Sequence, residues 1–216
     1  MIAPPPVAAR TEADLEFDRQ VAALVACGVA DLIDFREDTF RAALESLRDL
    51  LPVLPTARSG IPFVVVVPAA PPVELLAAVR TAGGAGFTTL PPDDVARFRP
   101  LPELDVPCTP YLLLDVDTGP DLLGLPPLEA QERITATGRT PLTLAEGLAV
   151  LVSAPGVLRS RNCFCLLGAR AGDKRVPALW VSSQRPRLGW TYQGTAHSWL
   201  GSASCGGRLG SPAPGN

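Results

Sequence analysis

The first stretch of the chain repeats apolar residues at helical spacing. We predict a helix over residues 11–27 because Thr11 and Asp14 have the spacing of a capping box. Gly28 is suited to end this helix, since glycine readily adopts the left-handed conformation found there. The apolar stripe of the helix comprises Leu15, Val21, Leu24 and Val25.

A second helical pattern follows directly. It begins near Asp38 or Thr39, and Pro52 is expected to end it because proline cannot continue a helix. Its three- and four-residue period is carried by Phe40, Ala43, Leu44, Leu47 and Leu51.

Further along the chain, the helical spacing gives way to uninterrupted runs of apolar residues. Residues 61–67 (IPFVVVV) and 111–115 (YLLLD) are predicted to be buried strands, since β-branched and leucine-rich runs of this length suit strands that are covered on both faces. Between them, residues 71–80 predict a short helix that starts with proline. The proline-rich residues 91–110 predict an extended surface connection.

In the second half of the chain, two predicted helices are followed by three predicted strands. Helices are predicted at 128–135, before Gly138, and at 143–154, where Thr143 and Glu146 have capping-box spacing. Strands are predicted at residues 163–167, 176–182 and 187–192, with a tight turn at Gly172-Asp173 between the first two.

N-terminal helices followed by a mixed or antiparallel sheet and a C-terminal β meander indicate the α+β class. We expect one domain over residues 11–205, with flexible termini at 1–10 and 206–216.

Composition limits the choice of partners and compartment. The net charge of −3 does not favour nucleic acid, and the longest apolar runs are too short to cross a membrane. The first ten residues lack the basic start and the apolar stretch of a signal peptide, so we expect a cytoplasmic protein. Five irregularly spaced cysteines suit reduced thiols. The oligomeric state is not predicted.

Several common site types are missing from the sequence. One histidine excludes two-His and three-His metal sites in a single chain, and the phosphate-binding, dinucleotide-binding and nucleophile-elbow motifs are absent. The one lysine, Lys174, falls on a predicted turn. The sequence therefore assigns neither a reaction class nor a cofactor.

Two sets of residues carry possible metal chemistry. Asp115 and Asp117 follow a predicted strand, where they can hold a divalent cation or cap a turn. Cys163 and Cys165 share a strand face, but they lack the spacing typical of zinc ligands, and buried cysteine usually packs as a small apolar residue. We favour turn and packing roles and predict no metal.

The sole imidazole and the aromatic residues carry the remaining candidate chemistry. His197 is the natural general acid or base, because its reference pKa is near neutrality, and Asp115, Asp173 or Glu146 can orient it. The C-terminal aromatic and arginine residues predict either an anion-binding pocket or packed core aromatics. This set comprises Trp180, Trp190, Tyr192 and Trp199 with Arg170, Arg175, Arg185 and Arg187.

Four segments together resemble a family of uncharacterised actinobacterial proteins classed as a domain of unknown function. They are FDRQVAALVACG, PYLLLDVDTGPD, GRTPLTLAEGLAVL and the stretch from NCFCLLGAR to HSWLGSASC, and the resemblance covers residues 14–209. It implies a bacterial, cytoplasmic, single-domain protein but no reaction and no catalytic residue. Relative to the family pattern, Cys165 replaces serine, Ala171 replaces cysteine and Tyr192 replaces tryptophan, which argues against a shared metal site at Cys163 and Cys165.

Two functions follow from these residues. The first is a small-molecule-binding protein, an enzyme of specialised metabolism, with His197, Asp115 and Asp117 in catalysis. Its ligand contacts would be Arg170, Arg175, Arg187, Trp190, Tyr192 and Trp199. The alternative is a non-catalytic interaction module that docks a protein through its tryptophan and arginine residues. A concave pocket holding these groups favours the first, and an exposed patch favours the second.

Overall fold

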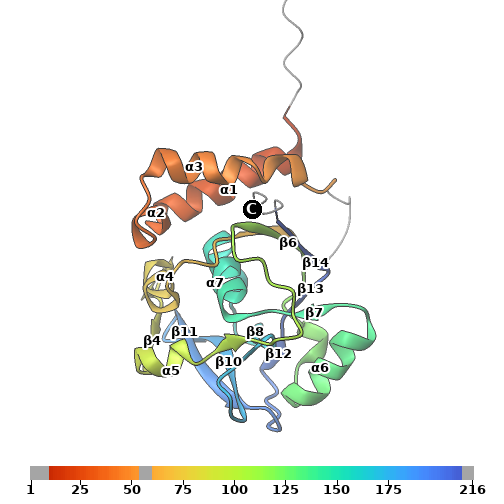
Figure 1. Ribbon diagram of the computed structural model, residues 1–216. Helices are drawn as coiled ribbons and strands as arrows, with labels where there is room; N and C mark the ends of the chain where they lie inside the picture. The colour runs from red at the N-terminus through yellow and green to blue at the C-terminus, as the bar shows by residue number, and fades with distance from the viewer. Residues whose placement is uncertain (1–9, 54–59, 211–216) are drawn as a thin grey trace, which may run out of the picture.

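The computed structural model describes residues 10–53 and 60–210, and an N-terminal helical layer opens the fold (Figure 1). The layer contains α1 (Glu12–Ala26), α2 (Val29–Leu32), α3 (Glu37–Glu45) and the short 3-10 helix η1 (Arg48–Leu50). The predicted capping box of Thr11 and Asp14 is present, and Gly28 follows α1 with a φ of 68°. Both end signals of the first helix are therefore confirmed.

Two details of this layer differ from the prediction. Leu15 is 57% exposed, whereas Phe17 is buried, because α1 turns a stripe that includes Phe17, Val21 and Leu24 toward the core. The second predicted helix is not continuous to Pro52, since α3 ends at Glu45 before η1.

The two apolar runs form a small antiparallel sheet. The strand β1 (Ile61–Val66) pairs with β6 (Tyr111–Val116), and β6 pairs on its other side with β14 (Gly207–Gly210). The expectation of a flexible terminus from residue 206 is wrong, because the backbone of β14 completes this sheet. Residues 1–9 and 211–216 lie outside the described residues.

A five-stranded sheet forms the opposite end of the molecule, in the order β12-β8-β10-β11-β4. Its strands are β4 (Phe87–Thr88), β8 (Cys163–Cys165), β10 (Arg175–Ser182), β11 (Arg185–Tyr192) and β12 (Leu200–Ser202). The tight hairpin turn lies between β10 and β11, where Ser183 and Gln184 both have positive φ. The predicted tight turn at Gly172-Asp173 is wrong, since the connection from β8 to β10 contains another strand, β9 (Ala169–Arg170).

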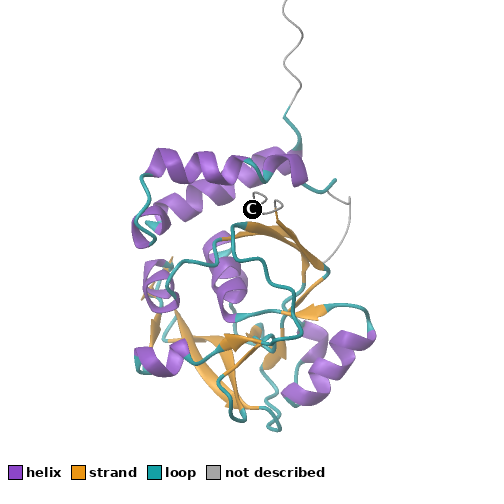
Figure 2. Cartoon of the chain, viewed as in Figure 1, coloured by secondary structure: helices purple, strands orange, loops and turns teal. Residues whose placement is uncertain are grey.

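Four further helices lie around and between the two sheets (Figure 2). They are α4 (Pro72–Ala78), α5 (Pro92–Ala96), α6 (Pro127–Ala136) and α7 (Leu144–Ser153). The second capping box, of Thr143 and Glu146, starts α7 as predicted. The prediction of extended chain over residues 91–110 is wrong in part, because proline at the first turn and the acidic Asp93 and Asp94 favour the start of α5.

Three short ladders and two 3-10 helices complete the described chain. The ladders pair β2 (Arg80–Thr81) with β3 (Gly84–Ala85), β5 (Arg99–Pro100) with β9, and β7 (Thr140–Pro141) with β13 (Ser204–Cys205). The 3-10 helices are η2 (Pro120–Leu122) and η3 (Pro155–Val157).

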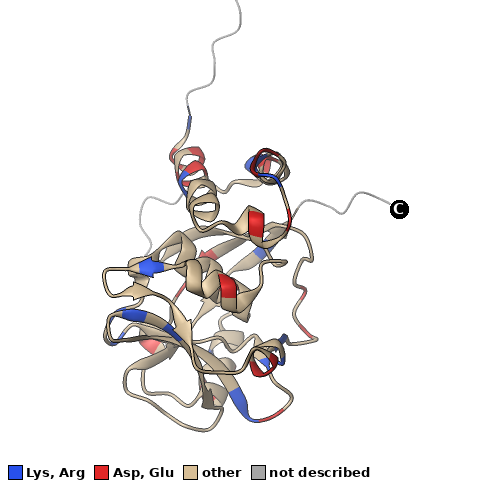
Figure 3. Cartoon of the chain, turned by 90° about the vertical axis from the view of Figure 1, so that its left-hand side faces the viewer, with Lys and Arg blue, Asp and Glu red and all other residues tan. Residues whose placement is uncertain are grey.

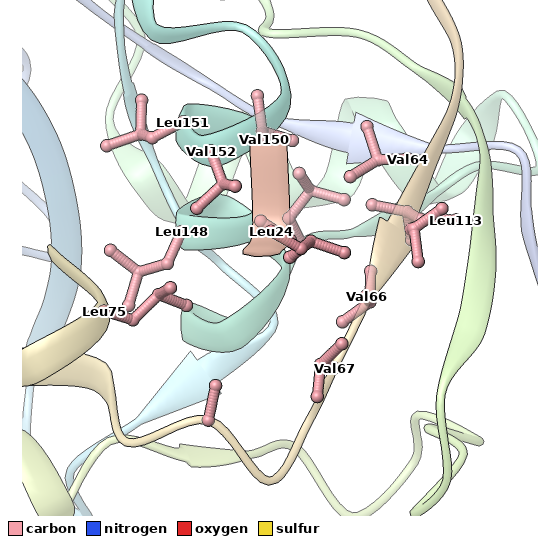
Figure 4. Close-up of a cluster of buried hydrophobic side chains, with 14 of the residues drawn as sticks. Leu24, Val64, Val66, Val67, Leu75, Leu113, Leu148, Val150, Leu151 and Val152 are labelled. Atoms are coloured by element: carbon pink, nitrogen blue, oxygen red, sulfur yellow. The ribbon is translucent and has the colours of Figure 1, made fainter. Parts of the chain in front are cut away.

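The main core surrounds α7. Leu148, Val150 and Leu151 of α7 belong to one buried cluster with residues of α1, β1 and β6, as Figure 4 shows for Leu24, Val64, Val66 and Leu113. A smaller cluster lies where α6 covers the β8 end of the five-stranded sheet. N-terminal helices together with antiparallel and mixed sheets confirm the α+β class. Within the described residues, no helix has both the length and the apolar composition needed to cross a membrane.

Candidate functional site

The five-stranded sheet separates the aromatic residues that the sequence suggested for one pocket. In the β10–β11 ladder, Trp180 pairs with Arg187, while Pro177 pairs with Trp190. Paired residues share a sheet face and consecutive residues alternate between faces. Trp180 and Arg187 therefore lie on one face of the sheet, and Trp190 and Tyr192 lie on the other.

An aromatic cluster occupies the first face. The indole of Trp180 lies over Gly189, where a Cβ atom would stand 2.2 Å from the Trp180 ring. The ring of Trp199 meets Trp180 edge-on at 6.1 Å and lies 5.4 Å from the imidazole of His197. His197 Nε2 is 2.9 Å from the hydroxyl of Thr191. Trp199 is 38% exposed, so the cluster reaches the surface.

Two arginines of β11 pack against aromatic rings at the same end of the sheet. The guanidinium of Arg187 is 5.5 Å from the centre of the Phe87 ring and 5.4 Å from that of Trp180. The guanidinium of Arg185 is 4.5 Å from the Phe87 ring. We call Phe87, Trp180, Arg185, Arg187 and Trp199 the arginine–aromatic face.

The hydrogen bonds of these arginines go to neutral oxygens. Arg185 Nε donates to the Ala85 carbonyl at 2.7 Å, and Arg187 Nη2 donates to the Thr89 hydroxyl at 3.1 Å. Among the described residues, the buried Nε of Arg187 has no acceptor, and neither arginine forms an ion pair. Ring contacts therefore hold Arg187 in place more than hydrogen bonds do.

The chain around this face is basic. No aspartate or glutamate occurs from Lys174 to the end of the sequence at Asn216. The exposed Arg80 of β2 lies close to Arg185, because both β2 and β3 contact β11 and Arg185 bonds to β3. Figure 3 views this side of the molecule and marks the basic and acidic positions.

The other face of the sheet holds Trp190 and Tyr192, whose rings meet edge-on at 4.9 Å. Arg175 lies 5.7 Å from the Trp190 ring, and it is also ion-paired with Asp173 at 2.9 Å and with Asp94 at 3.4 Å. Trp190 packs against the main core, whereas Tyr192 is 54% exposed. The carboxylates of Asp173 and Asp94 thus already neutralise the guanidinium of Arg175, which the sequence suggested as an anion contact.

Asp115 and Asp117 shape the turn after β6. Asp115 has a φ of 49°, and its Oδ2 accepts a hydrogen bond from Arg139 Nη1 at 2.6 Å. Asp117 Oδ1 accepts from the Gly119 amide at 2.8 Å, as in an Asx turn. Gly119 itself fits closely against Ser202, since a Cβ there would stand 2.1 Å from the Ser202 carbonyl oxygen. The contact of Asp117 agrees with the turn interpretation, whereas the carboxylate of Asp115 is ion-paired with Arg139.

The cysteines are also placed for packing. Cys163 and Cys165 are buried in the cluster under α6, and burial raises the pKa of the Cys165 thiol to about 12. Cys205 belongs to the main core, whereas Cys108 is exposed. Across the described residues, no three side chains of His, Cys, Asp and Glu are grouped so that they could hold a metal ion.

Arg170 lies apart from the arginine–aromatic face. Its Nη1 donates to the carbonyls of Leu167 and Ala169, at 2.6 Å and 2.9 Å, and its Nη2 donates to Gln131 Oε1 at 2.6 Å. Burial lowers the pKa of its guanidinium. Arg170 also lines a cavity of about 560 Å³ together with Arg97 and Arg99.

Cavities occur elsewhere than at the predicted site. His197, Asp115, Asp117 and the tryptophans line none of four cavities that are formed by described residues. The predicted catalytic residues contact different elements, because His197 bonds to β11 while Arg139 binds Asp115. Sequence reasoning missed Arg97 and Arg99, although PPDDVARFRP already places them beside two aspartates.

The comparisons with known proteins give a family. The model of DUF5701, a family of unknown function, matches residues 23–211. The chain belongs to DUF5701. No curated protein and no solved structure matches it. The family range agrees closely with the resemblance noted at residues 14–209, and it brings no ligand or reaction with it.

This DUF5701 chain also buries a complete ion-pair cluster beneath β14. Arg208 Nε and Nη2 donate to Glu146 Oε1 and Oε2 at 2.6 Å and 2.9 Å, and Tyr111 donates to Oε1 at 2.7 Å. Burial tends to lower the pKa of Arg208, but its bonds to Glu146 raise that pKa above the ordinary value. The backbone amide of Thr143 also donates to Glu146, which therefore joins the start of α7 to β14 and has no contact to spare for orienting His197.

Proposed function

We propose that this protein is a non-catalytic interaction module whose arginine–aromatic face docks an acidic protein segment. The observation that carries the proposal is that Arg185 and Arg187 are held on aromatic rings and bond only to neutral oxygens among the described residues. Their positive charge is therefore available to a partner.

Stacking on an aromatic ring holds an arginine in a position where it can bind a carboxylate. The planar guanidinium presents its N–H groups in a fixed fork that matches a carboxylate, and stacking reduces the conformational freedom that binding would otherwise remove. Arg185 and Arg187 share the Phe87 ring, so both guanidinium groups lie within 5.5 Å of the centre of one ring. An acidic segment with neighbouring carboxylates fits this pair.

The exposed aromatic residue beside the arginines supports docking in a second way. Trp199 stands edge-on to Trp180 and remains 38% exposed. Tryptophan and arginine are the residues most enriched among those that dominate binding energy at protein interfaces. Trp199 would provide apolar contact area next to the charged pair.

Charge complementarity selects an acidic partner. The face lies in a part of the sequence that has no acidic residue, although the whole chain has a net charge of −3. A partner bearing carboxylates would meet no repulsion from the residues of β10 and β11. Binding that rests on such exposed charges weakens as salt rises.

The shape of the region favours docking over catalysis. The hydroxyl of Thr191 lies within hydrogen-bond reach of His197, as a nucleophile and its base would. However, Thr191 is only 6% exposed, and none of the four described cavities opens on it. Substrate access to this pair is therefore poor, and an enzyme of specialised metabolism is the weaker proposal.

The proposed setting is the cytoplasm of an actinobacterium. The family resemblance suggests the organism. All five cysteines are free thiols, as a reducing compartment favours.

Fluorescence anisotropy with a labelled octaglutamate peptide tests the docking proposal. We expect the native protein to bind the peptide at low salt, and the double variant Arg185→Gln/Arg187→Gln to bind at least about tenfold more weakly, since hydrogen bonds to charged groups contribute about 1.5–3 kcal/mol each. Trp199→Ala is expected to weaken binding without changing the salt dependence.

The matched control is Arg36→Gln/Arg41→Gln, which removes the same charge from α3. Both of those arginines are exposed and ion-paired, with Asp38 and Glu37 respectively. The proposal fails if the native protein does not bind octaglutamate, or if both double variants weaken binding equally.

A further inference from the structure

Two arginines face each other across the short ladder of β5 and β9. Arg99 pairs directly with Arg170, so their side chains leave the same side of the ladder. Like charges directly opposite each other destabilise a pair of strands. Arg99 is exposed, and its guanidinium forms no hydrogen bond or ion pair with the described residues. The hydrogen bonds of the Arg170 guanidinium go to neutral oxygens.

Two carboxylates of this region, those of Asp94 and Asp173, already have arginine partners. Arg97 lies 3.6 Å from Asp94 and 3.5 Å from Asp173, and Arg175 contacts the same two aspartates. Glu103 is near enough to raise the pKa of Arg170 slightly, against the larger effect of burial. Arg99 and Arg170 therefore form no ion pair with these two aspartates, and other acidic residues of this region include Asp93, which lines a cavity with both arginines, and Glu103.

Two cavities adjoin at Arg99. The larger, of about 560 Å³, is lined by both arginines of the pair, by Arg97 and by Asp93. The smaller, of about 320 Å³, lies between α4, α5 and the start of α7. Ala96, Arg99 and Pro100 line both cavities, so the two cavities adjoin at these residues, and we call the adjoining pair the Arg99 groove. Figure 1 shows α4 and α5 on the same side of the molecule.

The smaller cavity is apolar. Its walls carry the side chains of Val95, Phe98, Val106 and Leu144, together with several prolines. Arg99 is the charged residue among its lining groups. Binding sites for small molecules commonly combine such apolar walls with a few polar groups that fix orientation, in volumes of about 300–1,000 Å³.

We propose that this groove binds an amphipathic acid, a carboxylate or phosphate monoester attached to a compact apolar group. The anionic group lies between Arg99 and Arg170, where it neutralises the opposed charges, and the apolar group fills the smaller cavity. This site is separate from the arginine–aromatic face, and its ligand does not depend on the docking proposal.

Titration calorimetry with octanoate and octyl phosphate, compared with octanol, tests the site on the full chain. We expect both anions to bind and octanol to bind at least about tenfold more weakly, because it lacks the charge. The tighter of the two anions identifies the head group. Arg99→Gln is expected to weaken binding of the anions at least about tenfold, and to leave octanol unchanged.

The control Arg161→Gln removes an exposed arginine of the loop before β8 and should leave octanoate binding unchanged. Ala96→Trp places a large side chain at the wall shared by both cavities and should abolish binding of the anions. Circular dichroism and thermal melts verify that each variant is folded. The proposal is overturned if neither anion binds the native protein, or if octanol binds as well as octanoate and Arg99→Gln has no effect.

The same variant separates this site from the arginine–aromatic face. Arg99→Gln is expected to bind octaglutamate as the native protein does, while Arg185→Gln/Arg187→Gln is expected to bind octanoate as the native protein does. If each variant loses binding of only one ligand, the two ligands bind at separate sites.

Discussion

Arg208 and Arg187 show two opposite uses of the same side chain in one molecule. Arg208 belongs to β14, and its buried side chain forms two hydrogen bonds with Glu146, one with Thr140 and one with the Pro141 carbonyl. Arg187 lies near the surface between two aromatic rings, with one hydrogen bond to Thr89.

The difference between the two arginines is whether their charge is paired inside the protein or available to a partner. The charge of Arg208 is fully compensated inside the protein, so it joins β14 to the start of α7 and offers nothing to a ligand. The charge of Arg187 is not compensated by any described carboxylate, so a partner can still bind it. A charged group whose hydrogen bonds are all made inside the protein, as those of Arg208 are, is therefore not the functional candidate.

The largest effect is expected for Arg208→Met. This variant leaves Glu146 buried without its cationic partner, which is expected to lower the free energy of unfolding by about 3–5 kcal/mol. Urea denaturation followed by circular dichroism measures the loss.

Arg187→Met is the matched control, with an expected change within about 1 kcal/mol, because its charge is not paired. Equal losses in the two variants would remove the distinction between the arginines. Adding Glu146→Gln to Arg208→Met should restore part of the stability, since the two residues act as one unit.

Gly189→Ala should give the second-largest effect. A Cβ atom at this position would lie 2.2 Å from the Trp180 ring, so the indole must move away from Arg187 and Trp199. We expect a loss of about 1–3 kcal/mol from overpacking, together with weaker octaglutamate binding. Urea denaturation and anisotropy measure the two effects.

Gly194→Ala serves as the control, since nothing lies within 4 Å of a Cβ at that position. Unchanged stability and octaglutamate binding in Gly189→Ala would show that Trp180 does not hold the arginine–aromatic face together.

A smaller effect is expected for His197→Ala. The hydroxyl of Thr191, which is 6% exposed, would lose its partner, at a cost of about 1 kcal/mol. His197→Gln keeps a hydrogen-bonding side chain and should recover part of this stability in the same urea titration. A loss as large as that of Arg208→Met would instead make the imidazole a central element of the fold.

The smallest effect concerns Asp14, which forms an ion pair with Arg48 near the surface. This pair is less buried than that of Arg208, and unlike Arg187 it does contain a carboxylate. Hydrogen bonds from the hydroxyl and the backbone amide of Thr11, followed by Arg48, lower the pKa of Asp14 from 3.8 to about 2. A lowered carboxylate pKa stabilises the fold above the unfolded-state pKa, and this contribution is lost as the pH falls from about 4 to about 2. Asp14→Asn should therefore lower the melting temperature slightly at pH 7, and this difference should vanish near pH 2.

Glu12→Gln removes a carboxylate from the same turn and serves as the control for the loss of one negative charge there. A constant difference between Asp14→Asn and the native protein at every pH would mean that the charge of Asp14 does not contribute.

Local signals predicted the elements that depend on neighbouring residues. Both capping boxes, at Thr11 and at Thr143, are present because each closes within one helical turn. The apolar runs became β1 and β6 because they are long enough to fill a covered strand. The predictions failed where distant contacts decided, as at residues 206–210, whose glycines gave no sign that they pair with β6.

The candidate site was predicted only in its composition. The sequence indicated that arginines and aromatic residues gather near the C-terminus, and that Cys163 and Cys165 are packing residues. It could not indicate that Trp180 and Trp190 lie on opposite faces of the sheet, because this depends on the β10–β11 register. It also missed Arg99. The importance of this residue arises from its pairing with Arg170, which lies 71 positions later in the sequence.

The amino-acid sequence by itself determined the α+β class, the helix starts and the cluster of basic and aromatic residues without acidic neighbours. These properties depend on residues that are close along the chain or on composition alone. Only the tertiary structure decided which arginines are compensated. Ion pairs and cation–π contacts act over a few ångströms, and folding brought Glu146 to Arg208 but brought Phe87 to Arg187.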